Sequence, residues 1–332
     1  LQSFLAVLPI LTAAILLVGF RWPAKRAMPI CYVVAVVVAI AFWKVDTVRV
    51  VASTLQGLFL TVNILYIIFG AILLLNTLKH SGAITAIRSG FADISPDRRV
   101  QLVLIAWLFG AFIEGSSGFG TPAAIAAPLM VAVGFPAMAA VMIGMMIQST
   151  PVTFGAVGTP ILIGVKGGLE SPELTAQLAQ VGMNFTDYLQ LITAQSAIIH
   201  AICGTLIPTF MVVMMTRFFG EKRSFREGLA IWPYALFAGL CFVGPYLLVA
   251  IFLGPEFPTL MGGLIGLAIL IPATRAGFLV PKTTWDFPDK SAWEKNWSGT
   301  ITMEHSGNTR VSILKLPRRA LLKALGFPYK EK

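Results

Sequence analysis

The stretch between Arg99 and Lys166 contains 66 residues and a single charged side chain, Glu114. As one straight helix it would be roughly 100 Å long, whereas the hydrocarbon core of a bilayer is about 30 Å thick. Its glycines and prolines also exclude one uninterrupted helix. Over the whole chain 12% of the residues are charged, compared with about 25% in soluble domains. The sequence therefore predicts an all-α, polytopic bundle of transmembrane helices that includes discontinuous or re-entrant helices.

Six further apolar runs have about the length that a membrane-crossing helix needs. They lie at residues 4–20, 28–43, 55–78, 188–216, 229–253 and 259–274. Together with the 66-residue stretch they predict a transmembrane domain at 1–280 and a polar, basic tail at 281–332. A basic tail can bind nucleic acid, but a cytoplasmic segment beside anionic lipid explains the charge more simply, so we expect no nucleic-acid partner.

The Lys and Arg residues of the loops alternate in number along the chain. Loops 21–27, 79–99 and 217–228 carry 3, 4 and 4, whereas loops 44–54, 166–187 and 254–258 carry 2, 1 and 0. The positive-inside rule places the first set in the cytoplasm, with the N-terminus outside and the tail inside. The 66-residue stretch must then cross an odd number of times. One crossing plus a re-entrant hairpin satisfies this condition, and so do three short crossings.

Two segments of that stretch carry residues that interrupt helices. The first, Phe112–Pro122, reads FIEGSSGFGTP, and the second, Gln148–Pro160, reads QSTPVTFGAVGTP. Both end in Gly-Thr-Pro, at a spacing of 38 residues. Unwound backbone survives in a membrane only inside the protein or beside a water-filled cavity. We therefore predict two broken segments, at 100–133 and 137–165.

A glycine-rich turn that leads into a half-helix capped by Thr and Pro forms an anion site, because free N–H groups and the positive end of the helix dipole converge there. Discontinuous helices hold substrates in many secondary transporters. The alternative is that these small residues only permit close packing and kinks. The predicted substrate-binding residues are Gly115, Ser116, Ser117, Gly118, Gly120, Thr121, Ser149, Thr150, Thr153, Gly158 and Thr159.

Glu114 is the predicted proton-coupling residue. An acidic side chain deep in a membrane is costly and usually functional. The alternative is a structural acid that accepts hydrogen bonds from the unwound backbone. His200, inside the run 188–216, is more typical of a contact between helices, and Gln148 adjoins the second break.

The two broken segments resemble the signature of the L-lactate permease family, in FIEGSSGFGTP at 112–122 and PVTFGAVGTPI at 151–161. The similarity continues in Gly134-Phe135-Pro136 and in Gly254 to Pro258. The resemblance implies a secondary active transporter, not an enzyme, in a bacterial plasma (inner) membrane. It implies uptake of L-lactate, and of glycolate or related 2-hydroxy monocarboxylates, by proton symport, with lipid as the surrounding partner and no cofactor or metal.

Members of that family are longer than this chain. The resemblance therefore implies that residues 1–280 form the first half of the family fold and that 281–332 is a truncated linker. On this interpretation the 332-residue chain alone inserts into a membrane but does not transport. A second copy, in a homo-oligomer, or a separate second half would complete it.

An intramembrane serine protease is the competing hypothesis. Gly115-Ser116-Ser117-Gly118 matches the pattern GxSG, and Ser117 with His200 as its base would suffice for acyl transfer. This hypothesis leaves Glu114 and the second Gly-Thr-Pro segment unexplained.

Overall fold

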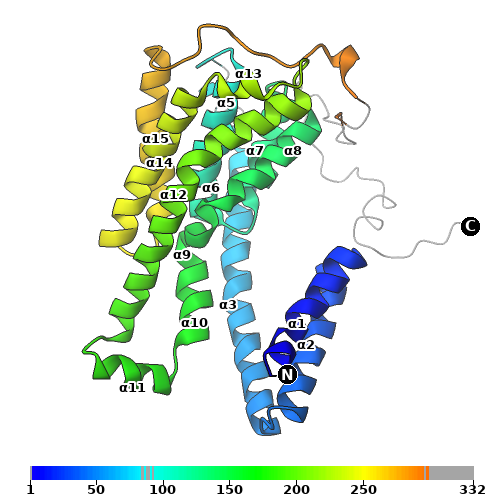
Figure 1. Cartoon of the computed structure of the whole chain (residues 1–332), viewed down its shortest axis with the longest axis vertical. Helices are drawn as coiled ribbons and strands as arrows, with labels where there is room; N and C mark the ends of the chain where they lie inside the picture. Colours follow the sequence, from blue (N-terminus) through cyan, green and yellow to red (C-terminus); the bar gives the residue numbers. More distant parts are fainter. Residues whose placement is uncertain (1, 84–85, 87–89, 92, 295–296, 299–332) are drawn as a thin grey trace, which may run out of the picture.

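The computed structural model describes residues 2–83, 86, 90–91, 93–294 and 297–298, and these residues form helices and loops without a strand (Figure 1). The helices are α1 (Gln2–Ala14), α2 (Ala24–Ala41), α3 (Thr47–His80), α5 (Arg98–Leu102), α6 (Gly110–Ser117), α7 (Thr121–Ala132), α8 (Ala137–Met146), α9 (Gly155–Thr159), α10 (Lys166–Leu169), α11 (Pro172–Gln180), α12 (Phe185–Phe219), α13 (Phe225–Leu229), α14 (Trp232–Phe252) and α15 (Pro258–Arg275). Turns of π-helix extend several of them, at Ile15–Gly19, Val103–Phe109 and Pro160–Val165. Turns of 3-10 helix lie at Ile147–Ser149, Pro151–Phe154 and Lys290–Ala292.

Seven helical segments of the described chain are long and apolar enough to cross a membrane. They are Ala24–Ala41, Thr47–Gly70, Arg98–Ser117, Pro151–Leu169, Phe185–Phe219, Trp232–Phe252 and Pro258–Arg275. The predicted all-α transmembrane bundle is confirmed. The run 4–20 corresponds to α1 and its π-helical turn, whose apolar part, Leu5–Gly19, is shorter than these seven segments. Helix α3 begins eight residues before the predicted run because the Asp46 side chain caps it, accepting a hydrogen bond from the Val48 N–H.

The stretch from Arg98 to Leu169 folds as a hairpin followed by a broken crossing. The first arm runs from α5 to α6, and α7 returns to the starting end, where the Arg98 guanidinium donates to the Val133 carbonyl. Helix α8 then runs antiparallel to α7, since a Cβ on Gly144 would lie 3.4 Å from the Cα of Ala123. The chain continues through α9 to α10 at the opposite end (Figure 1). The stretch thus begins at one end of the bundle and ends at the other, as both predicted arrangements require (Figure 1).

Helix α6 lies at the centre of the bundle because glycines let it approach α15 closely. A Cβ on Gly115 would lie 2.5 Å from the backbone N of Leu260, and a Cβ on Gly263 would lie 2.7 Å from the backbone N of Phe112. Small residues at membrane helix contacts commonly allow such an approach. Consequently, 89% of the residues in the Arg98–Ser117 span are buried, a larger share than in any other candidate span.

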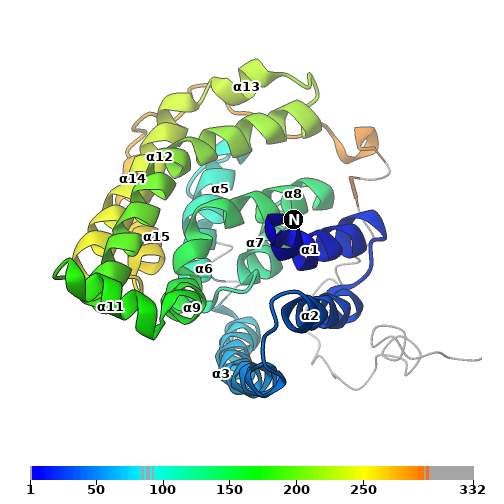
Figure 2. The same ribbon diagram turned by 60° about the horizontal axis from the view of Figure 1, so that its bottom comes forward.

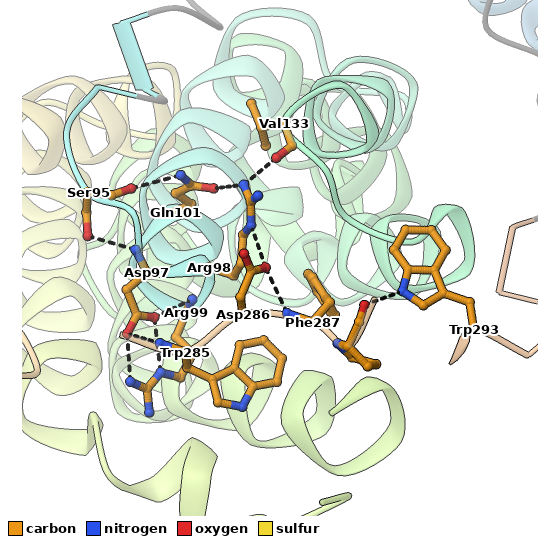
Figure 3. A network of polar contacts seen from close by, with 11 residues as sticks. Ser95, Asp97, Arg98, Arg99, Gln101, Val133, Trp285, Asp286, Phe287 and Trp293 are labelled. Carbon is orange, nitrogen blue, oxygen red and sulfur yellow. Dashed lines mark hydrogen bonds and ion pairs between the residues drawn. The ribbon is translucent and has the colours of Figure 1, made fainter. Parts of the chain in front are cut away.

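The tail-side end of the bundle is held by a network of charged side chains (Figure 3). Asp97 and Arg99 form an ion pair of 2.6 Å with both side chains 3% exposed. Asp97 also accepts a hydrogen bond from the Trp285 N–H at 3.1 Å, and Arg98 pairs with Asp286 at 3.0 Å. Removing one member of a buried pair leaves an uncompensated charge. The start of the hairpin is therefore fixed to the segment that follows α15.

That following segment, residues 281–298, crosses the end of the bundle, and we call its described part the tail strap (Figure 1). Trp285 and Trp297 are buried against the bundle, and the Met138 N–H donates to the Trp297 carbonyl at 3.1 Å. Its described residues form a loop with one turn of 3-10 helix, Lys290–Ala292. The rest of the predicted tail, 299–332, lies outside the residues that the structure describes.

Helices α1, α2 and α3 lie at one side of the bundle, with α2 and α3 joined by a short turn (Figure 2). No residue of the Thr47–Gly70 segment is buried by the rest of the described chain.

In the loop between α10 and α12 the sequence predicted no helix, yet α11 forms there. The Ser171 side chain caps it by accepting from the Leu174 N–H, and Pro172 occupies its first turn.

Candidate functional site

The two breaks share a run of positive φ angles. Each contains three consecutive residues with positive φ, followed by Thr and Pro. In the first break these are Gly118 (60°), Phe119 (52°) and Gly120 (78°), and in the second Ala156 (44°), Val157 (55°) and Gly158 (75°). A β-branched residue with positive φ is a steric outlier, and such strain clusters at functional sites. The predicted repeat of the two segments therefore extends to the sign of φ, whereas ψ at the first position differs, −154° at Gly118 and 52° at Ala156.

The threonine of each Gly-Thr-Pro makes the same hydrogen bond in both breaks. Thr121 Oγ1 donates to the Gly118 carbonyl at 2.7 Å, and Thr159 Oγ1 donates to the Ala156 carbonyl at 2.6 Å. Pro then starts the following helical segment, where a missing N–H costs nothing. Each break thus leads directly into a helix whose first N–H groups have no partner within that helix.

The two breaks also lie against each other. A Cβ on Gly118 would lie 2.7 Å from the Cβ of Ala156, and a Cβ on Gly155 would lie 2.7 Å from Glu114 Oε1. At Gly118 the obstacle includes the Ala156 backbone N at 2.8 Å, so glycine is required there, whereas at Gly155 it is the end of the Glu114 side chain, which can shift. Contact between the breaks brings Glu114 of the first segment to the backbone of the second.

Glu114 is 1% exposed, and its Oε2 atom has no hydrogen-bond partner among the described residues. Its backbone carbonyl accepts the Gly118 N–H at 2.9 Å, which closes the last turn of α6. Buried polar atoms are nearly always paired, and an exception in a native fold needs an explanation. No group of three or more His, Cys, Asp or Glu side chains in the described part of the chain could hold a metal ion.

Two cavities flank the second break. The glutamate cavity, of about 320 Å³, is lined by Ile64, Glu114, Gly118, Phe119, Gly120, Val152, Gly155, Ala156, Thr159, Pro160, Ile163 and Gly164. The serine cavity, of about 450 Å³, is lined by Ile67, Gly70, Ser116, Ser117, Ala156, Val157, Thr159, Leu162 and Ile163. Helix α3 borders both, and Thr159 faces both.

Half of the predicted site residues line one of these cavities. They are Glu114, Ser116, Ser117, Gly118, Gly120 and Thr159. Thr121 contacts Ser117 through its hydroxyl. Gly115 and Gly158 instead face backbone, because their Cβ atoms would lie 2.5 Å from the Leu260 N and 2.4 Å from the Pro255 carbonyl oxygen. The positions of Gly115 and Gly158 therefore agree with the alternative that small residues permit close packing of the backbone.

The remaining predicted residues, Ser149, Thr150 and Thr153, lie where the second break meets other helices. Thr150 is buried against Gly204 of α12. Thr153 Oγ1 and His200 Nε2 are 2.7 Å apart, and Thr259 donates to the Pro151 carbonyl at 2.8 Å. Neither cavity is lined by these three predicted residues. Thr150 and Thr153 thus contact α12, and Thr259 connects the second break to α15, whereas Ser149 is exposed.

The Ser–His pair of a serine protease is not formed. The Ser117 hydroxyl donates to the Ile113 carbonyl at 2.9 Å and contacts Thr121, whereas the His200 ring contacts Thr153. Each side chain thus has a different partner, and the protease hypothesis has no support in the structure.

Sequence reasoning missed Gly155, Ala156 and Val157, which line the cavities between the predicted Thr153 and Gly158. Their signal was the alignment of the two Gly-Thr-Pro motifs, which pairs Ala156 with Gly118 and Val157 with Phe119. It also missed the α3 residues Ile64 and Ile67, for which the sequence carries no signal beyond an apolar run.

Gly155→Ala tests the contact between Glu114 and the second break. Gly155 has φ −69° and ψ 161°, which alanine adopts freely, so the added methyl group acts mainly through its contact with the Glu114 carboxyl group, at 2.7 Å, and less through the Glu114 carbonyl oxygen, at 3.3 Å. We expect the free energy of unfolding to fall by about 1–3 kcal/mol, as for other overpacked sites. In Glu114→Ala the methyl group has room, so the double variant should lose less stability than the sum of the two single losses.

Denaturant unfolding in detergent measures these losses. Gly164→Ala is the matched control, because its Cβ would meet nothing within 4 Å although Gly164 lines the same cavity. Strictly additive losses in the Gly155 and Glu114 variants would show that the two residues are not in contact.

Comparison with known proteins gives one consistent set of relatives. The model of the L-lactate permease family matches residues 2–318. The chain is 32% identical to an L-lactate permease of Bacillus subtilis over 76% of this chain and 41% of the relative. It is 28% identical to an L-lactate permease of Escherichia coli K12 over 95% of this chain and 52% of the relative.

A glycolate permease of Escherichia coli K12 is 29% identical over 81% of this chain and 44% of that relative. The chain spans about half the length of the curated relatives it matches. No solved structure matches it.

Proposed function

The chain belongs to the L-lactate permease family, and from that membership we propose that it is part of a transporter that takes up L-lactate, and glycolate or related 2-hydroxy monocarboxylates, by proton symport. It is a multi-pass membrane protein of a permease family. The observation that carries the proposal is the pair of matching helix breaks, which meet at the unpaired carboxyl group of Glu114.

The substrate carboxylate binds at the first break. Helix α7 begins at Thr121 directly after Gly120, so its free N–H groups and the positive end of its dipole are available to an anion. Ser116, Ser117 and Thr159 add hydroxyl groups from the serine cavity. A short 2-hydroxy acid offers a carboxylate for the N–H groups and a hydroxyl group for these side chains.

Glu114 carries the transported proton. A carboxyl group without a partner, in an apolar cavity, is able to accept and release a proton without breaking an existing ion pair. A lactate anion and a proton that cross together carry no net charge. The membrane potential, which acts with about 2.3 kcal/mol per elementary charge per 100 mV, then neither drives nor opposes their transport.

Counterflow tests the substrate class. Membrane vesicles that contain the protein are loaded with unlabelled L-lactate and diluted into labelled L-lactate. We expect glycolate in the outer medium to compete, whereas propionate, which lacks the 2-hydroxyl group, competes about 5- to 150-fold less well because a buried polar group left unpaired costs about 1–3 kcal/mol. Equal competition by propionate would contradict recognition of the hydroxyl group.

The proposed location is a bacterial plasma membrane, with the N-terminus outside and the tail inside. Loops 79–99 and 217–228, rich in Lys and Arg, lie at the same end as the tail strap, where Arg223 pairs with Glu294. The acidic loop with α11 lies at the opposite end (Figure 1). This distribution supports the orientation that the positive-inside rule gives.

Cysteine labelling tests the orientation. In a background without Cys31, Cys203 and Cys241, Glu173→Cys should react with a membrane-impermeant maleimide added to intact cells, because Glu173 is exposed on the outer end. Lys222→Cys, equally exposed at the other end, should react only after the cells are opened. The reverse pattern would invert the orientation.

A further inference from the structure

We propose that the groove between α2 and α3 binds one anionic phospholipid, a role independent of the substrate site. The groove has a volume of about 750 Å³. Its walls are mainly apolar, with Val36 and Leu58 among them, and its polar side chains include Tyr32, Arg49 and Thr54. It lies between α2 and α3, at the side of the bundle that α1 to α3 form (Figure 2).

Arg49 supplies the charge that selects an anion. It lies in the first turn of α3, beside the short loop that joins α2 to α3. None of the hydrogen bonds and ion pairs among the described residues involves its guanidinium group. The nearby Asp46 carboxylate accepts instead from the Val48 N–H as the cap of α3. A guanidinium group at the end of a membrane helix matches a lipid phosphate, to which it can donate two parallel hydrogen bonds.

The dimensions of the groove fit an acyl chain. Lining residues of α3 run from Arg49 to Thr61, a helical rise of about 18 Å. One leaflet of a bilayer has a hydrocarbon depth of about 15 Å. A phospholipid whose phosphate lies at Arg49 therefore extends its chain along the whole groove. Tyr32 and Thr54, whose oxygens are 2.6 Å apart, bridge the two helices and close the groove between them.

The lining explains why the occupant is a lipid rather than a second copy of this chain. Arg49 is a cation and no acidic residue lines the groove, so the occupant must bring both an anion and an extended apolar chain. A phospholipid brings both in one molecule. The segment Thr47–Gly70 has no residue buried within the described bundle, so a lipid can reach the groove directly from the bilayer.

Native mass spectrometry of the purified protein, titrated with phosphatidylglycerol and with phosphatidylethanolamine, tests the proposal. We expect one tightly bound lipid and at least about a fivefold preference for phosphatidylglycerol, since one basic side chain near an anionic lipid contributes about 1 kcal/mol. Arg49→Gln should remove this preference and retain binding of phosphatidylethanolamine. Lys25→Gln, at the other end of α2, is the charge control and should behave like the unchanged protein.

Gly57→Leu tests the groove itself. A Cβ on Gly57 meets nothing within 4 Å, so the larger side chain fills the groove without a clash, and binding of both lipids should fall at least tenfold. Gly244→Leu, at an equally open position on α14, is the control, and unfolding temperatures confirm that both variants fold. Three results would each overturn the proposal: an unchanged preference in Arg49→Gln, unchanged binding in Gly57→Leu, or a dimer of the lipid-free protein that Gly57→Leu dissociates.

Discussion

Glu114→Gln is expected to reduce lactate uptake driven by a pH gradient to the level of vesicles without the protein, while exchange of internal for external lactate persists. Glutamine keeps the size and polarity of the side chain, so the contact with Gly155 and the closure of α6 are preserved. It cannot take up and release a proton. Net transport of a proton with lactate therefore stops, whereas exchange, which needs no net proton movement, continues.

Uptake and exchange of labelled L-lactate, measured in the same membrane vesicles, separate the two activities. Glu173→Gln is the matched control, because Glu173 is an exposed residue of α11 far from the breaks. Loss of both activities in Glu114→Gln would make Glu114 a structural residue, and normal gradient-driven uptake would exclude it from coupling.

Gly120→Val is expected to weaken lactate binding by about 10- to 150-fold, the range that corresponds to the loss of one hydrogen bond to a charged group, about 1.5–3 kcal/mol. Gly120 has φ +78°, and the nearest atoms to an added Cβ are those of the Gln148 amide, at 3.7 and 3.8 Å. The side chain thus has room, but a β-branched residue does not adopt this conformation without strain. The backbone before α7 must shift, so the N–H groups at the start of α7 no longer point at the carboxylate.

Concentration-dependent exchange of L-lactate measures this change in affinity. Gly244→Val is the control for a β-branched substitution in a membrane helix, because Gly244 has open space around it and lies outside both cavities. Unchanged affinity in Gly120→Val, with the protein folded, would exclude the first break as the carboxylate site.

Local sequence signals were sufficient to predict the membrane helices and the two breaks. Runs of apolar residues give each span, and the Gly-Thr-Pro at 120–122 and 158–160 marks where a helix restarts, because Pro and Thr have fixed roles at that point. The odd number of crossings, inferred from the loop charges, stays a prediction. The predicted ends of α3 were less accurate, because the capping residue Asp46 lies outside the apolar run from which the helix was predicted.

Contacts between distant segments were not predictable from the sequence. The approach of Gly155 to Glu114 depends on how the hairpin packs against the second break, which no local pattern encodes. Two predicted residues show the same limit. Thr150 and Thr153 adjoin a break, as a binding residue would, but the packing of α12 brings Gly204 and His200 against them. The position of α3 beside both cavities likewise depends on tertiary structure alone.

The most direct test of proton-coupled lactate transport is accumulation of labelled L-lactate in membrane vesicles of the source organism, with the gene intact or deleted. Vesicles with the protein should accumulate L-lactate when the outer medium is made acidic relative to the interior. The accumulation should vanish when a protonophore, with the membrane potential held at zero, collapses the pH gradient. Deletion of the gene should remove the gradient-dependent part. Equal accumulation with and without the gene, or uptake that is insensitive to the pH gradient, would contradict proton-coupled lactate transport by this protein.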